Sequence, residues 1–152
     1  RQTASSLLAV LDTKGRWFRN TIQCGYLKDD YKNKVNLLSS LAIFNSKYID
    51  YVYRRMVLET GRVFPQVKIK YLKSLPFIIP QKASQENLSE FAAKMLELNK
   101  KLAGESKDSE RWKKIKTDID RTDKEIDNEV YKLYGLKREE IEIIEQSTAK
   151  SS

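Results

Sequence analysis

The chain has 152 residues, 40% of them hydrophobic and 10% aromatic, which is enough for the core of one domain or of two small ones. One cysteine and no histidine exclude an intrachain disulfide, a Cys/His zinc site and catalysis by a Ser–His or Cys–His pair. The chain has no glycine-rich phosphate loop and no apolar run of the roughly 18 residues that cross a bilayer, so we expect neither an active site nor a membrane partner.

The net charge of +8 is unevenly distributed along the chain. Residues 1–81 hold 14 Lys and Arg against 5 Asp and Glu, whereas residues 82–152 hold 15 against 16. The positive excess therefore belongs to the first half, which indicates a polyanion partner for that half and a scaffold role for the second. Because the chain starts with Arg1 and not with methionine, we expect it to be a piece of a longer protein.

The first residues are predicted to form β structure. A short apolar run at 5–11 is followed by a turn at 12–15 that ends in Gly15. Residues 16–27 are rich in aromatic and β-branched side chains, which favours a β-hairpin or two adjacent strands. Cys24 lies in this stretch, and we expect it to be a buried free thiol.

A helix and a further strand are predicted for the rest of the basic half. Apolar side chains of residues 33–58 fall on one broad helical face. Residues 67–71 alternate apolar side chains with lysines, which indicates a half-buried strand with a basic outer face. Prolines bracket the extended residues 76–80. We place there the end of a small mixed α/β recognition domain over residues 1–80.

Residues 81–146 are predicted to form an antiparallel, coiled-coil-like helical hairpin. One apolar stripe runs along 88–102, a polar break follows at 104–109, and a second stripe runs along 110–136. Gly135 is suited to end the second helix because glycine accepts the left-handed conformation. Two amphipathic helices joined by a short polar loop pack with their stripes facing inward.

A short helix over residues 137–145 and a disordered tail over residues 147–152 are predicted to end the chain. The expected fold class is therefore α+β, with a mixed recognition domain, a helical hairpin and a short C-terminal helix. Carboxylates at 118–129 alternate with Lys and Arg, which is typical of a solvated helix face and not of a metal site.

Cations interleaved with aromatic residues in the basic half are the candidate nucleic-acid contacts. Phosphate binding needs Lys or Arg along a surface, and base reading needs Arg, Lys, Asn or Gln projecting from a strand, loop or helix. We predict base reading near residues 62–73. The candidate DNA-binding residues are Arg16, Arg19, Lys47, Arg54, Arg55, Arg62, Lys68, Lys70 and Lys73.

Three stretches resemble one known family. They are SSLAIFNSKYIDYVYR at 39–54, FPQVKIKYLKSLPFIIP at 64–80 and IDNEVYKLYGLKREEIEIIE at 126–145. In this order they are similar to the TaqI-like C-terminal specificity domain of adenine-specific DNA methyltransferases and of restriction enzymes that fuse nuclease and methylase. Phe44 stands where the family usually has leucine, and Lys137 where it usually has threonine.

The resemblance implies a DNA target-recognition module of a restriction–modification protein in the prokaryotic cytoplasm. Its partners would be double-stranded DNA and an upstream methyltransferase or nuclease domain. S-adenosylmethionine would bind that absent methyltransferase domain, so the resemblance implies no cofactor for this chain. The family's base-reading residues vary with the target, so none is carried over.

Three alternatives remain open from the sequence. The chain resembles, more faintly, a piece of a Type I specificity subunit, which also joins recognition domains to helical hairpins. A coiled-coil protein-interaction module, in which the hairpin forms a homodimer and DNA is not bound, is a different class. The concentration of positive charge in one half argues against it. RNA in place of DNA is the third.

Overall fold

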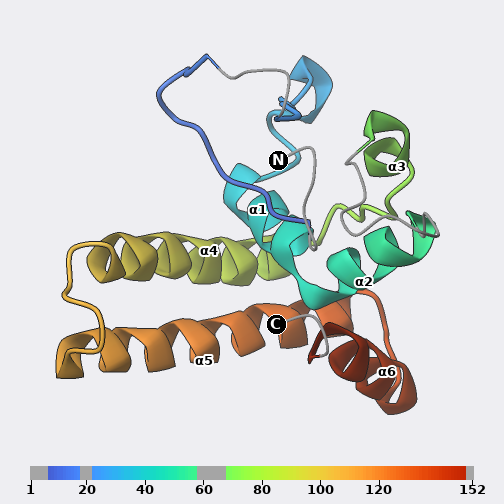
Figure 1. The fold of residues 1–152 in the computed structure, drawn as a ribbon. Helices are drawn as coiled ribbons and strands as arrows, with labels where there is room; N and C mark the ends of the chain where they lie inside the picture. The colour runs from blue at the N-terminus through green and yellow to red at the C-terminus, as the bar shows by residue number, and fades with distance from the viewer. Residues whose placement is uncertain (1–6, 18–21, 58–67, 150–152) are drawn as a thin grey trace.

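The structure is a computed structural model that describes residues 7–17, 22–57 and 68–149. Every element of regular secondary structure in these residues is a helix, and residues 7–17 and 22–28 precede the first one. None of the helices in this part of the chain is long and apolar enough to cross a membrane. In chain order the elements are a 3₁₀ helix η1 (Asp29–Tyr31), α1 (Leu37–Asn45), α2 (Lys47–Met56), α3 (Ile69–Lys73), α4 (Lys82–Leu102), α5 (Glu110–Leu133) and α6 (Arg138–Ala149) (Figure 1).

Helices α4 and α5 form the predicted antiparallel hairpin, which is the longest feature of the molecule (Figure 1). Leu88 of α4 and Ile126 and Val130 of α5 belong to the predicted stripes and are buried in one core cluster. The Ser109 side chain caps α5 by accepting the N–H of Trp112 at 3.1 Å. The prediction of a hairpin is therefore confirmed.

The end of α5 is set by glycine, as predicted. Gly135 has a φ of +62°, which a residue with a Cβ adopts only with strain. The N–H of Leu136 donates to the Tyr131 carbonyl and the N–H of Gly135 to the Lys132 carbonyl, each at 3.0 Å. These two bonds are those of a Schellman motif, which satisfies the last carbonyls of the helix.

The single helix predicted over residues 33–58 is wrong, because two helices meet there at Ser46. Ser46 is extended, with a φ of −69° and a ψ of 151°, and its side chain accepts the N–H of Ile49 to cap α2. Asn36 caps α1 in the same way. Apolar residues continue across Ser46, so the periodicity of the sequence did not reveal the break.

The α+β fold class is also wrong, because no strand occurs in the residues that the structure describes. Residues 69–73 form α3, in which the half-buried residues are Tyr71 and Leu72. The N–H groups of both donate to the Lys68 carbonyl, so a helical turn satisfies the backbone where no neighbouring strand is present. The β-hairpin or adjacent strands predicted near the N-terminus are also absent from residues 7–17 and 22–28. Cys24 is exposed, so the prediction of a buried thiol is wrong.

One apolar core joins the two predicted parts of the chain. Ala42 and Ile43 of α1 and Ile49 of α2 are buried in the cluster that also holds the hairpin residues. Gln85 of α4 adds polar links, because its amide accepts the N–H of Asn36 and donates to two backbone carbonyls. The core therefore crosses residue 80, and a domain boundary at that residue stays a prediction.

Helix α6 is longer than predicted. It runs from Arg138 to Ala149, so the expected end at Glu145 is wrong and residues 147–149 of the expected tail are helical. Ile144 is buried and the Thr148 hydroxyl donates to its carbonyl at 3.0 Å. Contacts with α2 hold α6 beside the base of the hairpin (Figure 1).

Candidate functional site

Five of the predicted DNA-binding residues lie on or next to two helices that pack against each other. Helices α2 and α3 are in contact, and α3 stands beside the C-terminal end of α2 (Figure 1). Residues 68–81 contain several lysines and no acidic residue. We call this surface the basic corner, and it consists of Arg54, Arg55, Lys68, Lys70 and Lys73.

Two cations of the basic corner are held by tyrosine rings. The guanidinium of Arg55 lies 5.4 Å from the centre of the Tyr51 ring, and its Nε and Nη2 each donate to the Tyr51 hydroxyl at 3.3 Å. The ammonium of Lys70 lies 4.6 Å from the centre of the Tyr71 ring. Such contacts restrict a cation without neutralising it, so both charges stay available to an anion.

The cations of the basic corner differ in whether a carboxylate neutralises them. Arg54 forms an ion pair with Asp50, whose Oδ2 lies 2.6 Å from Nη2. Within the described residues, Arg55, Lys70 and Lys73 meet no carboxylate. The unneutralised charge of the corner therefore lies on Arg55 and α3.

Lys47 lies apart from the basic corner, at the other end of α2. Its ammonium lies 2.9 Å from Glu145 Oε2 and 3.2 Å from Asp127 Oδ2, and its backbone N–H donates to Asp127 Oδ1 at 2.9 Å. Tyr131 completes the cluster by donating its hydroxyl to Glu145 Oε1 at 2.8 Å. Lys47 thus joins α2 to α5 and α6, with two carboxylates about its charge.

Burial and charge act against each other in this cluster. Burial raises the pKa of Asp127 to about 6, although the Lys47 N–H and ammonium act in the opposite direction. Burial disfavours the charged form of Lys47 too, but Glu145 and Asp127 raise the pKa of Lys47 above its ordinary value. Hydrogen bonds from Lys47 and Tyr131 outweigh burial and hold the pKa of Glu145 below its ordinary value. The charge of Lys47 is therefore used in ion pairs within the fold.

Asn45 is a contact that the sequence analysis missed. Its side chain accepts the N–H of Ala9 at 2.8 Å and donates to the Ala9 carbonyl at 3.0 Å. Asp50 assists by accepting the N–H of Leu7 at 2.6 Å. In the stretch Asn45-Ser46-Lys47, one side chain therefore binds the N-terminal segment, the next caps α2 and the third pairs with the hairpin. Charge alone singled out Lys47 in the sequence, whereas only the resemblance included Asn45 and Ser46.

The remaining predicted residues are not brought to the basic corner by the described structure. Arg16 is exposed on the N-terminal segment, where its Nε lies 4.0 Å from Asp12 Oδ1 and its N–H donates to Asp12 Oδ2. Arg19 and Arg62 lie outside the described residues. Of the stretch 62–73 that was predicted to read bases, the structure describes residues 68–73.

Comparison with known protein families identifies the domain. The TaqI-like C-terminal specificity domain matches residues 1–77. The chain belongs to this family. Comparisons with curated proteins and with solved structures found no match.

The match confirms the predicted family and includes the stretch at 39–54 and most of that at 64–80, whereas the stretch at 126–145 lies beyond it, so its resemblance stays a prediction. The family is that of a specificity module of restriction–modification systems. A specificity domain of this family is a recognition part of a larger protein. The match includes α1, α2, α3 and all five residues of the basic corner. It ends before the hairpin, so Asp127 and Glu145, the carboxylates about Lys47, lie outside the matched residues.

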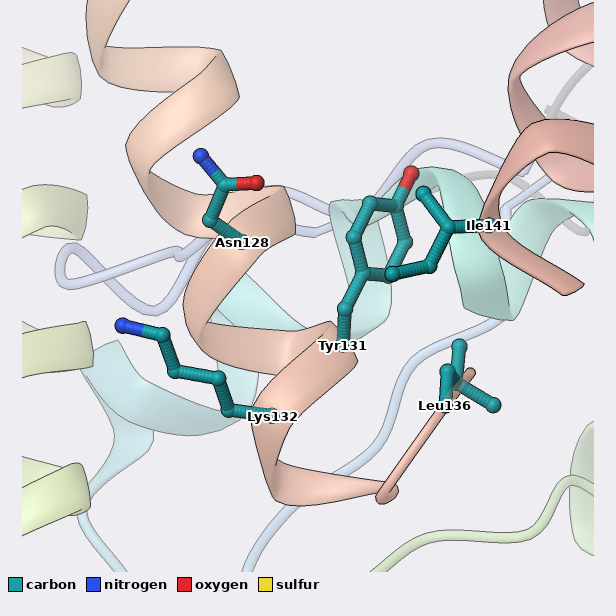
Figure 2. Close-up of a pocket in the computed structure, with 5 residues that line it drawn as sticks. All are labelled: Asn128, Tyr131, Lys132, Leu136 and Ile141. Carbon is teal, nitrogen blue, oxygen red and sulfur yellow. The ribbon is translucent and has the colours of Figure 1, made fainter. Parts of the chain in front are cut away.

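A shallow pocket of the specificity module lies away from the basic corner. It is about 290 Å³ in volume and is formed where α5 ends and α6 begins (Figure 2). It is lined by Asn128, Tyr131, Lys132, Leu136 and Ile141.

Across the residues that the structure describes, no group of three His, Cys, Asp or Glu is placed to hold a metal ion.

Proposed function

We propose that this chain binds double-stranded DNA as the specificity module of an adenine-specific DNA methyltransferase or of a restriction enzyme with a fused methylase. The observation that carries the proposal is the basic corner, in which Arg55, Lys70 and Lys73 are exposed within the family match and meet no carboxylate of the described residues. Phosphate contacts of this kind supply most nonspecific DNA affinity and set the register of a protein on the duplex.

The two helices of the basic corner have different roles in this proposal. Lys70 and Lys73 on α3 contact phosphates, since a lysine is a flexible point charge. Arg55 is restricted by Tyr51, and a guanidinium with free N–H donors is suited to phosphates and to guanine edges. The hairpin and the Lys47 cluster hold this surface at a fixed angle to a methyltransferase or nuclease domain elsewhere in the parent protein. That domain would bind S-adenosylmethionine.

The proposal is tested by fluorescence anisotropy with a random duplex at low and moderate salt. Lys70→Glu combined with Lys73→Glu should weaken binding and flatten the slope of log affinity against log salt by about 0.9 for each phosphate that is no longer neutralised. The matched control is Lys107→Glu with Lys114→Glu, which makes the same change in net charge on two exposed lysines that form no ion pair within the described residues. Equal weakening by both pairs would mean that only net charge matters, and it would remove the basic corner from the interface.

A further inference from the structure

Tyr51 occupies one edge of the Arg55 guanidinium and leaves its end open. Arg55 Nε and Nη2 both donate to the Tyr51 hydroxyl at 3.3 Å, and the ring centre lies 5.4 Å from the guanidinium carbon. Within the described residues, Nη1 meets no acceptor, and Nη2 keeps an N–H that is not used by Tyr51. The open end therefore presents a planar pair of donors, one from each terminal nitrogen.

The support for this side chain is local to α2. Tyr51 and Arg55 are four residues apart, so they lie on the same face of the helix, one turn from each other. Tyr51 is half-buried, whereas Arg55 is exposed. The neighbouring Arg54 differs, because its Nη2 is paired with Asp50 Oδ2. Arg55 is thus a cation whose direction is restricted by a neutral group and whose charge is not offset.

A planar pair of donors fits two acceptors that lie side by side in one plane. In the major groove of DNA, N7 and O6 of guanine form such a pair, and arginine is the side chain that most often binds them. Two oxygens of a phosphate are the other pair on the same duplex. A phosphate needs charge more than direction, and Lys70 and Lys73 of α3 supply such charge next to the end of α2. The fixed direction of Arg55 therefore favours a base.

We propose that Arg55 reads a guanine of the DNA target through N7 and O6, and that Tyr51 is the positioning residue for this contact. The inference rests on the proposed function, in which the chain binds double-stranded DNA. It moves base reading to the end of α2, beside the stretch 62–73 for which the sequence predicted it. Because Tyr51 holds the guanidinium before DNA arrives, less side-chain freedom is lost on binding.

Selection of bound duplexes from a random library tests the assignment. The wild-type chain should prefer guanine over adenine by about tenfold or more at one position of the enriched sequence. Arg55→Gln should lose this preference and keep those at other positions. The matched control is Arg111→Gln, which removes the same charge at the tip of the hairpin, from a side chain that is 84% exposed, and it should keep every preference. The same guanine enriched by Arg55→Gln would overturn the proposal, as would a wild-type chain that prefers no guanine.

A duplex with 7-deazaguanine at the selected position separates a base contact from a phosphate contact, because this base lacks the N7 acceptor. The wild-type chain should bind it about fivefold more weakly than the guanine duplex, whereas Arg55→Gln should bind both duplexes equally. Equal binding of both duplexes by the wild-type chain would overturn guanine reading and assign Arg55 to a phosphate.

Tyr51→Phe tests the positioning role, because it removes the hydroxyl and keeps the ring and every charge. The preference for guanine should fall by about threefold or more, while the affinity for random duplex at low salt stays the same. An unchanged preference would overturn the role of Tyr51. Failure of the proposed function is distinguishable, because it would appear as no binding of random duplex at low salt. Binding without a preferred guanine would overturn this inference alone.

Discussion

Lys47 and Asp127 lie 80 residues apart in the sequence and meet twice in the fold. The backbone N–H of Lys47 donates to Asp127 Oδ1 at 2.9 Å, and its ammonium lies 3.2 Å from Oδ2. The second contact is an ion pair without hydrogen-bond geometry, so the buried Oδ2 has a counter-charge but no donor. The first helical residue of α2 is thereby fixed to the C-terminal half of α5.

Replacement of Lys47 should destabilise the fold and leave the proposed DNA contacts of the basic corner intact. Lys47→Met leaves the buried Asp127 without its counter-charge, so we expect the free energy of unfolding to fall by about 2 kcal/mol. This is less than the usual cost of breaking a fully buried ion pair, because the Lys47 side chain is 28% exposed. Urea denaturation measures it. Lys32→Met breaks the exposed pair with Asp29 and should cost at most about 0.5 kcal/mol. Unchanged stability with weakened DNA binding would instead make Lys47 a phosphate contact.

The pKa of Asp127 predicts a pH dependence of stability with a definite sign. Its pKa is about 6 in the folded chain and about 3.9 when unfolded, so the folded chain binds this proton more tightly. The stabilisation from Asp127 is therefore complete below about pH 4 and is lost as the pH rises through 6. Asp127→Asn removes this loss while keeping an oxygen that accepts the Lys47 N–H.

The stability of Asp127→Asn relative to the wild-type chain should therefore rise by about 2 kcal/mol between about pH 4 and about pH 7.5. Thermal or urea unfolding of both proteins across this range measures the difference. A constant difference would show that Asp127 titrates at its ordinary pKa in the fold.

The glycine that ends α5 should be needed for its backbone conformation and not for space. At Gly135 an added Cβ meets no atom within 4 Å, yet φ is +62°. Gly135→Ala should therefore lower the free energy of unfolding by about 1 kcal/mol through backbone strain. Gly104→Ala is the control, because its Cβ would be 3.5 Å from the Lys101 carbonyl oxygen, an ordinary contact, and its φ is not positive. Equal effects would contradict the conformational explanation.

Removal of the Asn45 side chain should release the N-terminal segment. Asn45→Ala loses both hydrogen bonds to Ala9, so the Ala9 amide should exchange faster and the free energy of unfolding should fall by about 1 to 2 kcal/mol. Asn99→Ala removes an exposed bond to the Met95 carbonyl and should change neither quantity appreciably. An unchanged Ala9 exchange rate in Asn45→Ala would show that Asp50 and the packing of Leu7 hold the segment alone.

The helical hairpin was predictable because the sequence pattern that specifies each helix is local and repeats along it. Stripes that recur at steps of three and four along a helix of 24 residues identify it, and Gly135 identifies its end. Residues 67–71 are too few for the pattern of apolar side chains to distinguish a strand from a helical turn. The described structure has no neighbouring strand there, and residues 69–73 form a helix. The break at Ser46 was hidden because the apolar pattern continues on both sides of it.

The candidate site was only partly predictable, because the sequence shows where the cations are but not which carboxylates neutralise them. Lys47 and Arg54 both lie in the helix predicted over residues 33–58, yet Lys47 pairs with Asp127 and Glu145 and Arg54 pairs with Asp50. The carboxylates about Lys47 come from positions 80 and 98 residues further along the chain. Spacing within one helix cannot show such pairings. The absence of acidic residues from 68–81 is visible in the sequence, and it agrees with the unneutralised lysines of α3.

The contacts of Lys47 also limit where the chain can be joined to another protein in a chimera. The family match ends at residue 77, but both counter-ions of Lys47 and the buried Leu88 and Val130 come later in the chain. A chimera joined at residue 77 would replace these partners with those of another protein and leave a charge and an apolar surface uncovered. Exchanging this module between two proteins of the family therefore requires a graft that extends through α6.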